Sequence, residues 1–343
     1  MSKQVLVTGG AGFIAHQVIA TILKQTDWRV VTIDRLDFSG NLNRIHEVVQ
    51  ELDASQRRRL RVVFHDMKSE FNDQIRNSIG ECRIILHLGA ASHVARSIVD
   101  PLSFVMDNTV GTCNVLNFAR QQADLERFVY FSTDEVFGPA PWGVDYDERA
   151  RYNSTNPYSA SKAGGEELCV AFHNTYGTPV YICHTANVYG RRQHPEKYIP
   201  LCIRKILKDE LLSIHADPVT GQPSSRHYVH VQDVADALLF LLNLDETRLR
   251  PEARTQGSAK CPKFNIISNT EFDNLELAQK VAKVLHRPLR YELADFHQAR
   301  PGLDLRYSLS GDLMKSLGWQ PSQSFDRRLK DLVEWTQANP QWL

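Results

Sequence analysis

Short apolar runs alternate with longer amphipathic stretches through the first half of the chain. The runs are rich in β-branched and aromatic residues and have no polar side, which is typical of strands buried on both faces. They occupy residues 4–9, 29–34, 61–66, 83–90, 127–133 and 179–186. Between these runs, apolar residues recur with the period of a helix. In residues 12–25, for example, the apolar side consists of Phe13, Ile14, Val18, Ile22 and Leu23. This alternation predicts a doubly wound parallel α/β sheet of the Rossmann type.

The pattern changes near residue 190. The later segments are two polar, loop-like stretches at 189–200 and 216–227, a strand end leading into a helix at 229–242, a charged irregular stretch at 246–263, a short strand at 264–267, and helices at 274–285 and 328–337. We therefore predict a large first domain, residues 1–186 plus 228–266. A smaller, discontinuous C-terminal α/β domain would hold residues 187–227 plus 267–343.

Charge and cysteine usage exclude several classes of partner. The 343 residues include 40 basic and 40 acidic side chains, so bulk charge favours neither nucleic acid nor an acidic membrane. No apolar run reaches the roughly 18 residues of a membrane span, and the chain enters its first strand with no room for a signal peptide. The six cysteines have neither a CxxC pair nor metal-ligand spacing. We expect a cytoplasmic protein without a metal site.

A glycine-rich turn separates the first strand from the first helix. Gly9, Gly10 and Gly12 let the backbone turn tightly and approach a pyrophosphate, and the helix N-terminus beyond them offers unpaired N–H groups. Phe13 and Ile14 form the start of that helix. The segment predicts a dinucleotide site, and the alternative is a plain structural turn.

Acidic residues near the ends of the next two strands refine the predicted cofactor. Asp34, 22 residues after Gly12, can accept both hydrogen bonds from an adenosine ribose and repels a 2′-phosphate, which favours NAD over NADP. Arg35 follows directly and could neutralise that preference. Asp66, with Met67 beside it, is placed to contact adenine, although a solvated turn aspartate would give the same pattern.

Two further groups of residues predict acid–base chemistry. Tyr158 and Lys162 share one face of a predicted helix, and an ammonium beside a phenol lowers the tyrosine pKa from about 10 toward neutrality. Thr133, Asp134 and Glu135 follow a strand end, where ligands of such sheets bind. An acid that protonates a leaving hydroxyl, next to a carboxylate that removes a C–H proton, is suited to eliminating water. The alternative for Tyr158 and Lys162 is that they are ordinary helix residues. The alternative for Asp134 and Glu135 is that they are a solvated pair in a loop.

Four segments together carry a resemblance to a known family. They are VTGGAGFI (7–14), STDEVFG (132–138), YSASK (158–162) and NVYG (187–190). On these motifs the chain resembles the extended short-chain dehydrogenase/reductases, and within them the nucleotide-sugar 4,6-dehydratases. The likeness runs from residue 4 to the final residues. It implies that the first domain binds NAD and the second a nucleotide-diphosphate sugar.

The resemblance also implies a role for each matching residue. Tyr158 would take the proton of the sugar C4 hydroxyl as NAD accepts a hydride, assisted by Lys162 and Thr133. Glu135 would then remove the C5 proton while Asp134 protonates the departing C6 hydroxyl, giving a 4-keto-6-deoxyhexose. The residues implied at the cofactor are those of the glycine-rich turn with Asp34, Arg35, Asp66, Met67, Tyr158 and Lys162, and those implied at the substrate are Ser92, His93, Asn187, Lys197, Arg226 and Asn265.

The identity of the substrate stays open at this point. Leu303 and Thr270 stand where thymidine-specific members of the family have a histidine and an asparagine. A dTDP-hexose and a UDP-hexose are therefore both candidates, and the hexose could be glucose or an N-acetylated sugar.

Two other functions use the same scaffold. A nucleotide-sugar 4-epimerase would need the same NAD, Tyr158 and Lys162 but no elimination, and the Asp134–Glu135 pair favours the dehydratase over it. A catalytically silent NAD-binding protein is the third interpretation. In the resembling family, subunits pair through two helices, so apolar helices around residues 103–122 and 157–175 predict a homodimer.

Overall fold

Seven parallel strands form the central sheet of the computed structural model, which describes residues 2–248, 261–268, 270–295 and 305–343. The strands lie in the order β10-β6-β5-β4-β1-β2-β3, and every neighbouring pair is parallel. Their bounds are β1 (Gln4–Thr8), β2 (Arg29–Asp34), β3 (Leu60–Phe64), β4 (Ile84–His87), β5 (Arg127–Phe131), β6 (Val180–Thr185) and β10 (Lys263–Ile266). The strand order reverses between β1 and β4, and ligands of open parallel sheets bind outside such a reversal.

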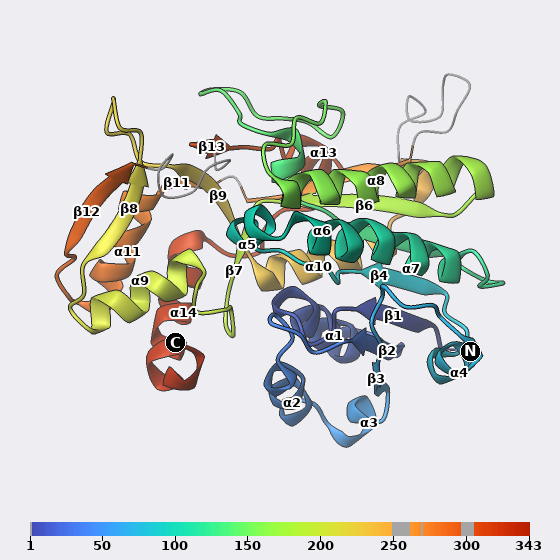
Figure 1. The fold of residues 1–343 in the computed structure, drawn as a ribbon. Helices are drawn as coiled ribbons and strands as arrows, with labels where there is room; N and C mark the ends of the chain where they lie inside the picture. Colours follow the sequence, from blue (N-terminus) through green and yellow to red (C-terminus); the bar gives the residue numbers. More distant parts are fainter. Residues whose placement is uncertain (1, 249–260, 269, 296–304) are drawn as a thin grey trace.

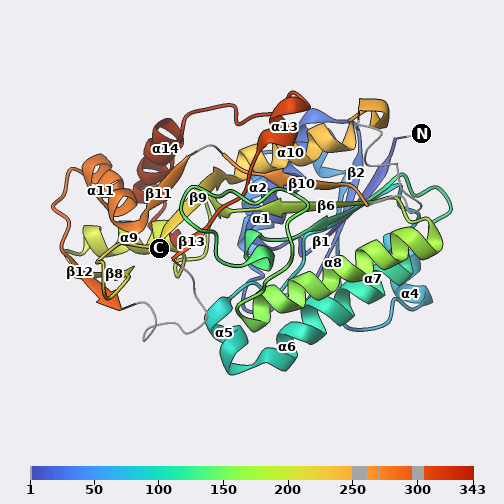
Figure 2. The same cartoon turned by 90° about the horizontal axis from the view of Figure 1, so that it is seen from above.

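Helices cover both faces of this sheet, which confirms the predicted doubly wound fold (Figures 1 and 2). One face packs against α1 (Phe13–Gln25), α2 (Leu42–Gln50), α10 (Val231–Leu242) and α13 (Asp312–Ser316). The other face packs against α4 (Asp73–Ile79), α7 (Gly111–Ala119) and α8 (Pro157–Tyr176). The inner strands are apolar on both sides because each side contacts one of these helix layers. The edge strand β3 differs from the expectation of burial on both faces, since Val62 is 45% and Phe64 67% exposed.

A smaller lobe with its own core lies beside the sheet (Figure 1). Its strands are β7 (Asn187–Tyr189), β8 (Leu212–Ala216), β9 (Ser225–His230), β11 (Glu271–Asp273), β12 (Tyr291–Asp295) and β13 (Arg306–Tyr307). Its helices are α9 (Tyr198–Leu207), α11 (Asn274–Leu285) and α14 (Phe325–Ala338). The proposed division between residues 227 and 228 falls inside β9, and the assignment of the two domains stays a prediction.

Several short helices complete the described chain. They are α3 (Ala54–Arg57), α5 (Val94–Val99), α6 (Pro101–Val105), the π-helical turn η1 (Met106–Val110), and the 3₁₀ turns η2 (Asp134–Phe137), η3 (Glu246–Arg248) and η5 (Pro340–Trp342). None of the described helices is long and apolar enough to span a bilayer.

Some element boundaries differ from the sequence-based expectation. Residues 225–227 were expected in a loop but belong to β9, because they pair antiparallel with β11. Asp66 lies beyond the end of β3, and its carboxylate accepts a hydrogen bond from the Lys68 N–H at 3.0 Å, a turn that ends the strand. Most of the irregular stretch 246–263 lies outside the described residues.

Gly9→Ala is expected to destabilise the fold by about 2–4 kcal/mol, through left-handed backbone strain and overpacking together. Gly9 has a φ of 69°, and a Cβ there would lie 2.6 Å from the Cα of Gly89. Gly177→Ala is the matched control, because Gly177 has a φ of 68° but no atom within 4 Å of the added carbon. Chemical denaturation of both variants checks this, and equal losses would show that the close approach to Gly89 carries no cost.

Candidate active site

A cavity of about 320 Å³ opens at the carboxyl ends of the central strands, where the strand order reverses. Most of the residues predicted from the sequence line it. They are Gly9, Gly12, Phe13, Ile14, Asp34, Arg35, Asp66, Met67, Ser92, His93, Thr133, Asp134, Glu135, Tyr158, Lys162, Asn187 and Lys197. The cavity thus brings together segments from the ends of six strands, β1 to β6, with α8 and the smaller lobe.

One end of the cavity has the features of a dinucleotide site. Gly9 approaches the backbone of Gly89 so closely that Gly9 has no room for a side chain. Helix α1 begins after Gly12, which provides no side-chain cap, so the first N–H groups of the helix are available to an anion. Asp34 lies at the carboxyl end of β2, where its two oxygens accept hydrogen bonds from the Ala11 and Leu36 N–H groups. These residues fit a pyrophosphate and an adenosine ribose.

Arg35, whose charge could have offset Asp34, is already paired. Its guanidinium donates to both carboxylate oxygens of Asp107 at 2.6 Å and to Asp37. The hydrogen bonds that Arg35 donates to Asp107 and then Asp37 raise the pKa of Arg35. A cation held by two carboxylates is a poor partner for a 2′-phosphate, so the arrangement favours NAD over NADP.

The acid pair lies in the cavity directly after β5. Thr133 caps the turn η2, and its hydroxyl donates to the Asp134 carboxylate at 3.0 Å. Burial and the neighbouring Glu135 charge raise the pKa of Asp134 to about 7. The nearby Arg226 charge opposes that rise. A carboxyl group that is half protonated near neutral pH can act as a general acid there.

Tyr158 and Lys162 share one face of α8 and both line the cavity, as predicted. Their electrostatics differ from the expectation. Burial and the Glu135 charge raise the pKa of Tyr158, and the Lys162 ammonium donates to the Phe131 carbonyl at 2.7 Å. Burial lowers the pKa of Lys162 to about 8. The predicted lowering of the Tyr158 pKa by Lys162 is therefore not seen in this structure.

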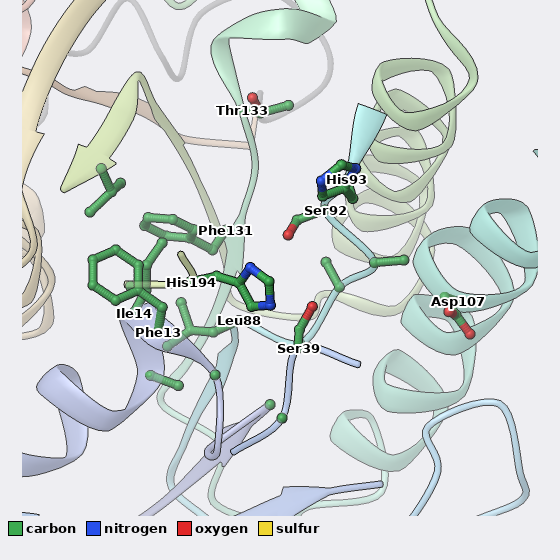
Figure 3. Close-up of a pocket in the computed structure, with 18 of the residues that line it drawn as sticks. Phe13, Ile14, Ser39, Leu88, Ser92, His93, Asp107, Phe131, Thr133 and His194 are labelled. Carbon is green, nitrogen blue, oxygen red and sulfur yellow. The ribbon is translucent and has the colours of Figure 1, made fainter. Parts of the chain in front are cut away.

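Residues of the smaller lobe reach the same cavity. Asn187 comes from β7, and Lys197 precedes the first turn of α9. Figure 3 shows His194, which the sequence analysis did not single out, between Phe13 and Ile14 on one side and Ser39 and Ser92 on the other.

Two predicted substrate residues do not line the described cavity. Asn265 is fully buried and its amide donates to the carbonyls of Tyr146 and Ser310, and its contact with the substrate stays a prediction. Arg226 is 8% exposed, donates to the Leu305 carbonyl and lies over the Tyr307 ring. Its contact with a diphosphate stays a prediction.

Thr270 and Leu303 are the two residues that left the nucleobase open in the sequence analysis. Thr270 does not line the described cavity. Leu303 lies outside the described residues.

A buried carboxylate on α8 was missed by the sequence analysis. Glu166 follows Tyr158 and Lys162 at helical spacing and has no exposed surface. It accepts from the Tyr152 hydroxyl at 2.6 Å and from Ser132, and it lies 3.1 Å from His184 Nε2. Because Ser132 directly follows β5 and lies two residues before Asp134, this network anchors the end of β5 to the helix that carries Tyr158.

Glu166→Gln is expected to destabilise the protein by about 3–5 kcal/mol near neutral pH, because it leaves its buried partners without their anion. Burial alone would raise the pKa of Glu166, but His184, Lys263 and Ser132 lower it to about 2. A depressed carboxyl pKa stabilises the fold above the unfolded value of about 4.5, and that contribution is lost as the pH falls toward 2.

The deficit of Glu166→Gln should therefore shrink between about pH 5 and pH 3. Denaturant titrations at several pH values measure it. Glu167→Gln, at the neighbouring exposed position, is the control and should lose little at any pH. A deficit that stays constant down to about pH 3 would show that the carboxylate charge is not what stabilises this network.

Comparison with known proteins agrees with this geometry. Residues 5–253 match the model of the NAD dependent epimerase/dehydratase family. The dTDP-glucose 4,6-dehydratase of Neisseria meningitidis serogroup B is 33% identical, with 99% of this chain and 95% of that protein covered. The dTDP-D-glucose 4,6-dehydratase of Mus musculus is 31% identical, with 98% and 90% covered.

A solved structure has the same architecture over almost the whole chain. DesIV, a dTDP-glucose 4,6-dehydratase from Streptomyces venezuelae solved with NAD and TYD bound, is 31% identical and superposes with a TM-score of 0.82, covering 99% of this chain and 98% of that one. The fold, the glycine-rich turn, the Tyr158–Lys162 pair and the family match all lead to one assignment. The chain belongs to the NAD-dependent epimerase/dehydratase family.

Proposed function

We propose that this protein is an NAD-dependent nucleotide-sugar 4,6-dehydratase that converts dTDP-glucose, or a related nucleotide hexose such as UDP-glucose, to the 4-keto-6-deoxy sugar. The observation that carries the proposal is the Asp134–Glu135 pair, which lines the same cavity as Tyr158. A 4-epimerase needs the phenol and the cofactor but has no use for a buried acid beside a carboxylate. The relatives at 31–33% identity named above are dTDP-glucose 4,6-dehydratases.

The glycine-rich turn and Asp34 would hold NAD, which would supply the acceptor for the C4 hydride and the donor for its return to C6. Tyr158 takes the proton of the C4 hydroxyl, and Thr133 is placed to hydrogen-bond the C4 oxygen. The 4-keto group makes the C5 proton acidic, and Glu135 removes it as the C6–O bond breaks. Asp134 gives its proton to the departing oxygen, so one water leaves. The pKa of Asp134 near 7 means that this acid still carries a proton at neutral pH.

Incubation with dTDP-glucose or UDP-glucose tests this function directly. The expected product gives the alkali-induced absorbance of a 4-keto-6-deoxy sugar, and no external oxidant is required because the cofactor ends as it began. Recovery of only the galactose epimer would favour the epimerase. No turnover of either sugar, together with bound NAD, would favour the silent NAD-binding protein.

We further propose that the protein is a cytoplasmic homodimer. Apolar side chains are exposed on α5, α6 and η1, with Val99 at 86%, Leu102 at 69% and Val105 at 41% exposure. Together with the long α8 beside them, these helices form a surface suited to pairing with a second copy (Figure 2). The described cysteines are all free thiols, as in a reducing compartment.

Leu102→Glu is expected to convert the dimer to a monomer, because a carboxylate would be buried at the centre of the pairing surface. Sedimentation velocity measures the mass. Val219→Glu is the control, since Val219 is 91% exposed at a hairpin tip in the other lobe. A wild-type protein that sediments as a monomer would remove the dimer from this account.

A further inference from the structure

Asn156 occupies a position between the two halves of the acid–base machinery. It is the N-cap of α8, two residues before Tyr158, and only 5% of it is exposed. Its Oδ1 accepts a hydrogen bond from the Ser159 N–H at 2.9 Å. Its Nδ2 donates to Oε2 of Glu135 at 3.0 Å. One side chain therefore caps the helix that carries the phenol and binds the carboxylate that would remove the C5 proton.

The orientation of this amide follows from its partners. Ser159 presents a backbone N–H, which can only donate, so the amide oxygen must face it. The amide nitrogen is then the group that faces the Glu135 carboxylate. A hydrogen bond to an ionised acceptor is roughly twice as strong as one between neutral groups.

We propose that Asn156 is a positioning residue for the elimination step, holding the Glu135 carboxylate in register with Tyr158. This inference rests on the proposed dehydratase function. C4 and C5 are adjacent carbons of one sugar ring, so the groups that deprotonate at each must keep a fixed separation. Asn156 supplies that separation because it is rigidly part of the helix that holds Tyr158 and is bonded to Glu135.

The two half-reactions depend on Asn156 to different extents. Oxidation at C4 uses Tyr158, Lys162 and Thr133. In the described part of the chain, Thr133 donates to Asp134 and Lys162 to the Phe131 carbonyl, whereas the Asn156 amide donates to Glu135. Elimination uses Glu135, whose carboxylate accepts a hydrogen bond from the Asn156 side chain. Loss of the amide therefore slows removal of the C5 proton and leaves oxidation at C4 unchanged.

Asn156→Ser tests the inference, because serine is as good an N-cap as asparagine but is too short to reach Glu135 as well. The substrate is dTDP-glucose, with and without deuterium at C5, under single-turnover conditions. Absorbance of the reduced nicotinamide follows oxidation, and quenched samples follow the 4-keto-6-deoxy product. The expected result is unchanged oxidation, elimination slowed about 10- to 100-fold, and a larger isotope effect on the product.

Two more variants complete the experiment. Asn72→Ser is the matched control, because Asn72 caps α4 through the Ile75 N–H, away from the site, and should leave both rates unchanged. Asn156→Asp keeps the cap but places a second carboxylate beside Glu135. Two carboxylates that share a site resist ionisation, so the acidic limb of the elimination rate should move to higher pH.

The outcomes separate this inference from the function on which it rests. A wild-type enzyme that forms no 4-keto-6-deoxy sugar contradicts the proposed function. A wild-type enzyme that forms it while Asn156→Ser eliminates at the same rate overturns the inference alone. Equal slowing of oxidation and elimination in Asn156→Ser also overturns it, because that result indicates a general structural role.

Discussion

Asp134→Asn is expected to lower kcat for 4-keto-6-deoxy sugar formation by about 10²- to 10⁴-fold, the usual contribution of a general acid. The amide keeps the shape of the carboxyl group but has no proton to give to the C6 oxygen. In the wild type the same chemistry makes the rate fall as the pH rises through about 7, where Asp134 loses its proton. The variant should lack this limb of the pH profile.

The same substitution is expected to make the protein more stable above neutral pH. The pKa of Asp134 is raised from 3.8 to about 7, so the folded state holds the proton more tightly than the unfolded state. Below about pH 4 the buried carboxyl is therefore protonated in both states and does not lower the free energy of unfolding. Between about pH 4 and pH 7 it lowers that free energy progressively. Removing it should add about 2–4 kcal/mol to the free energy of unfolding at about pH 8, and little at about pH 4.

Activity and denaturation measured on one preparation of Asp134→Asn check both effects. Asp124→Asn removes an exposed carboxylate and serves as the control for the loss of one negative charge. A variant that is inactive but no more stable at alkaline pH would contradict the raised pKa. A variant that keeps wild-type activity would contradict the role of Asp134 as the acid.

Tyr158→Phe is expected to lower kcat by about 10²- to 10⁴-fold and to stop the reaction before any elimination. The phenol is the group that takes the C4 hydroxyl proton, and no later step can proceed without the 4-keto group. Burial and the Glu135 charge raise the pKa of Tyr158, and the phenylalanine removes this hydroxyl while keeping the ring. The variant should therefore bind NAD and form no reduced nicotinamide when the sugar is added.

Tyr176→Phe is the control on the same helix, since Tyr176 is 53% exposed at the far end of α8. Stopped-flow absorbance of the reduced nicotinamide gives the oxidation rate for both variants. Rapid formation of reduced nicotinamide by Tyr158→Phe would show that another group takes the C4 proton.

Much of the fold could be predicted because its signals are local. A strand buried on both faces is apolar throughout, and the glycine-rich turn between β1 and α1 is contiguous in sequence. Asp134 and Tyr158 could be found for a similar reason, since one follows a strand end and the other has its lysine partner on the next turn of a helix. Parallel strand ends meet at one edge, so these local signals also predicted that the site is assembled there.

The remaining features depend on contacts between distant segments. Asn265 was assigned by likeness, and its hydrogen bonds from β10 to the carbonyls of Tyr146 and Ser310 became visible only in the structure. Lys162 donates to the Phe131 carbonyl because of how α8 packs on β5, which spacing within α8 does not specify. Asn156 left a readable signal, an asparagine directly before a proline at a helix start, but its bond to Glu135 became visible only in the structure.

The central claim is that one cavity oxidises C4 and removes water across C5 and C6. Mass spectrometry and NMR of the product formed from dTDP-glucose in heavy water, with deuterium at C4 of the sugar, test it most directly. The account predicts a product that has lost one water, carries the C4 deuterium at C6, and has gained one solvent deuterium at C5. A product of unchanged composition, inverted at C4 and without solvent deuterium at C5, would contradict it.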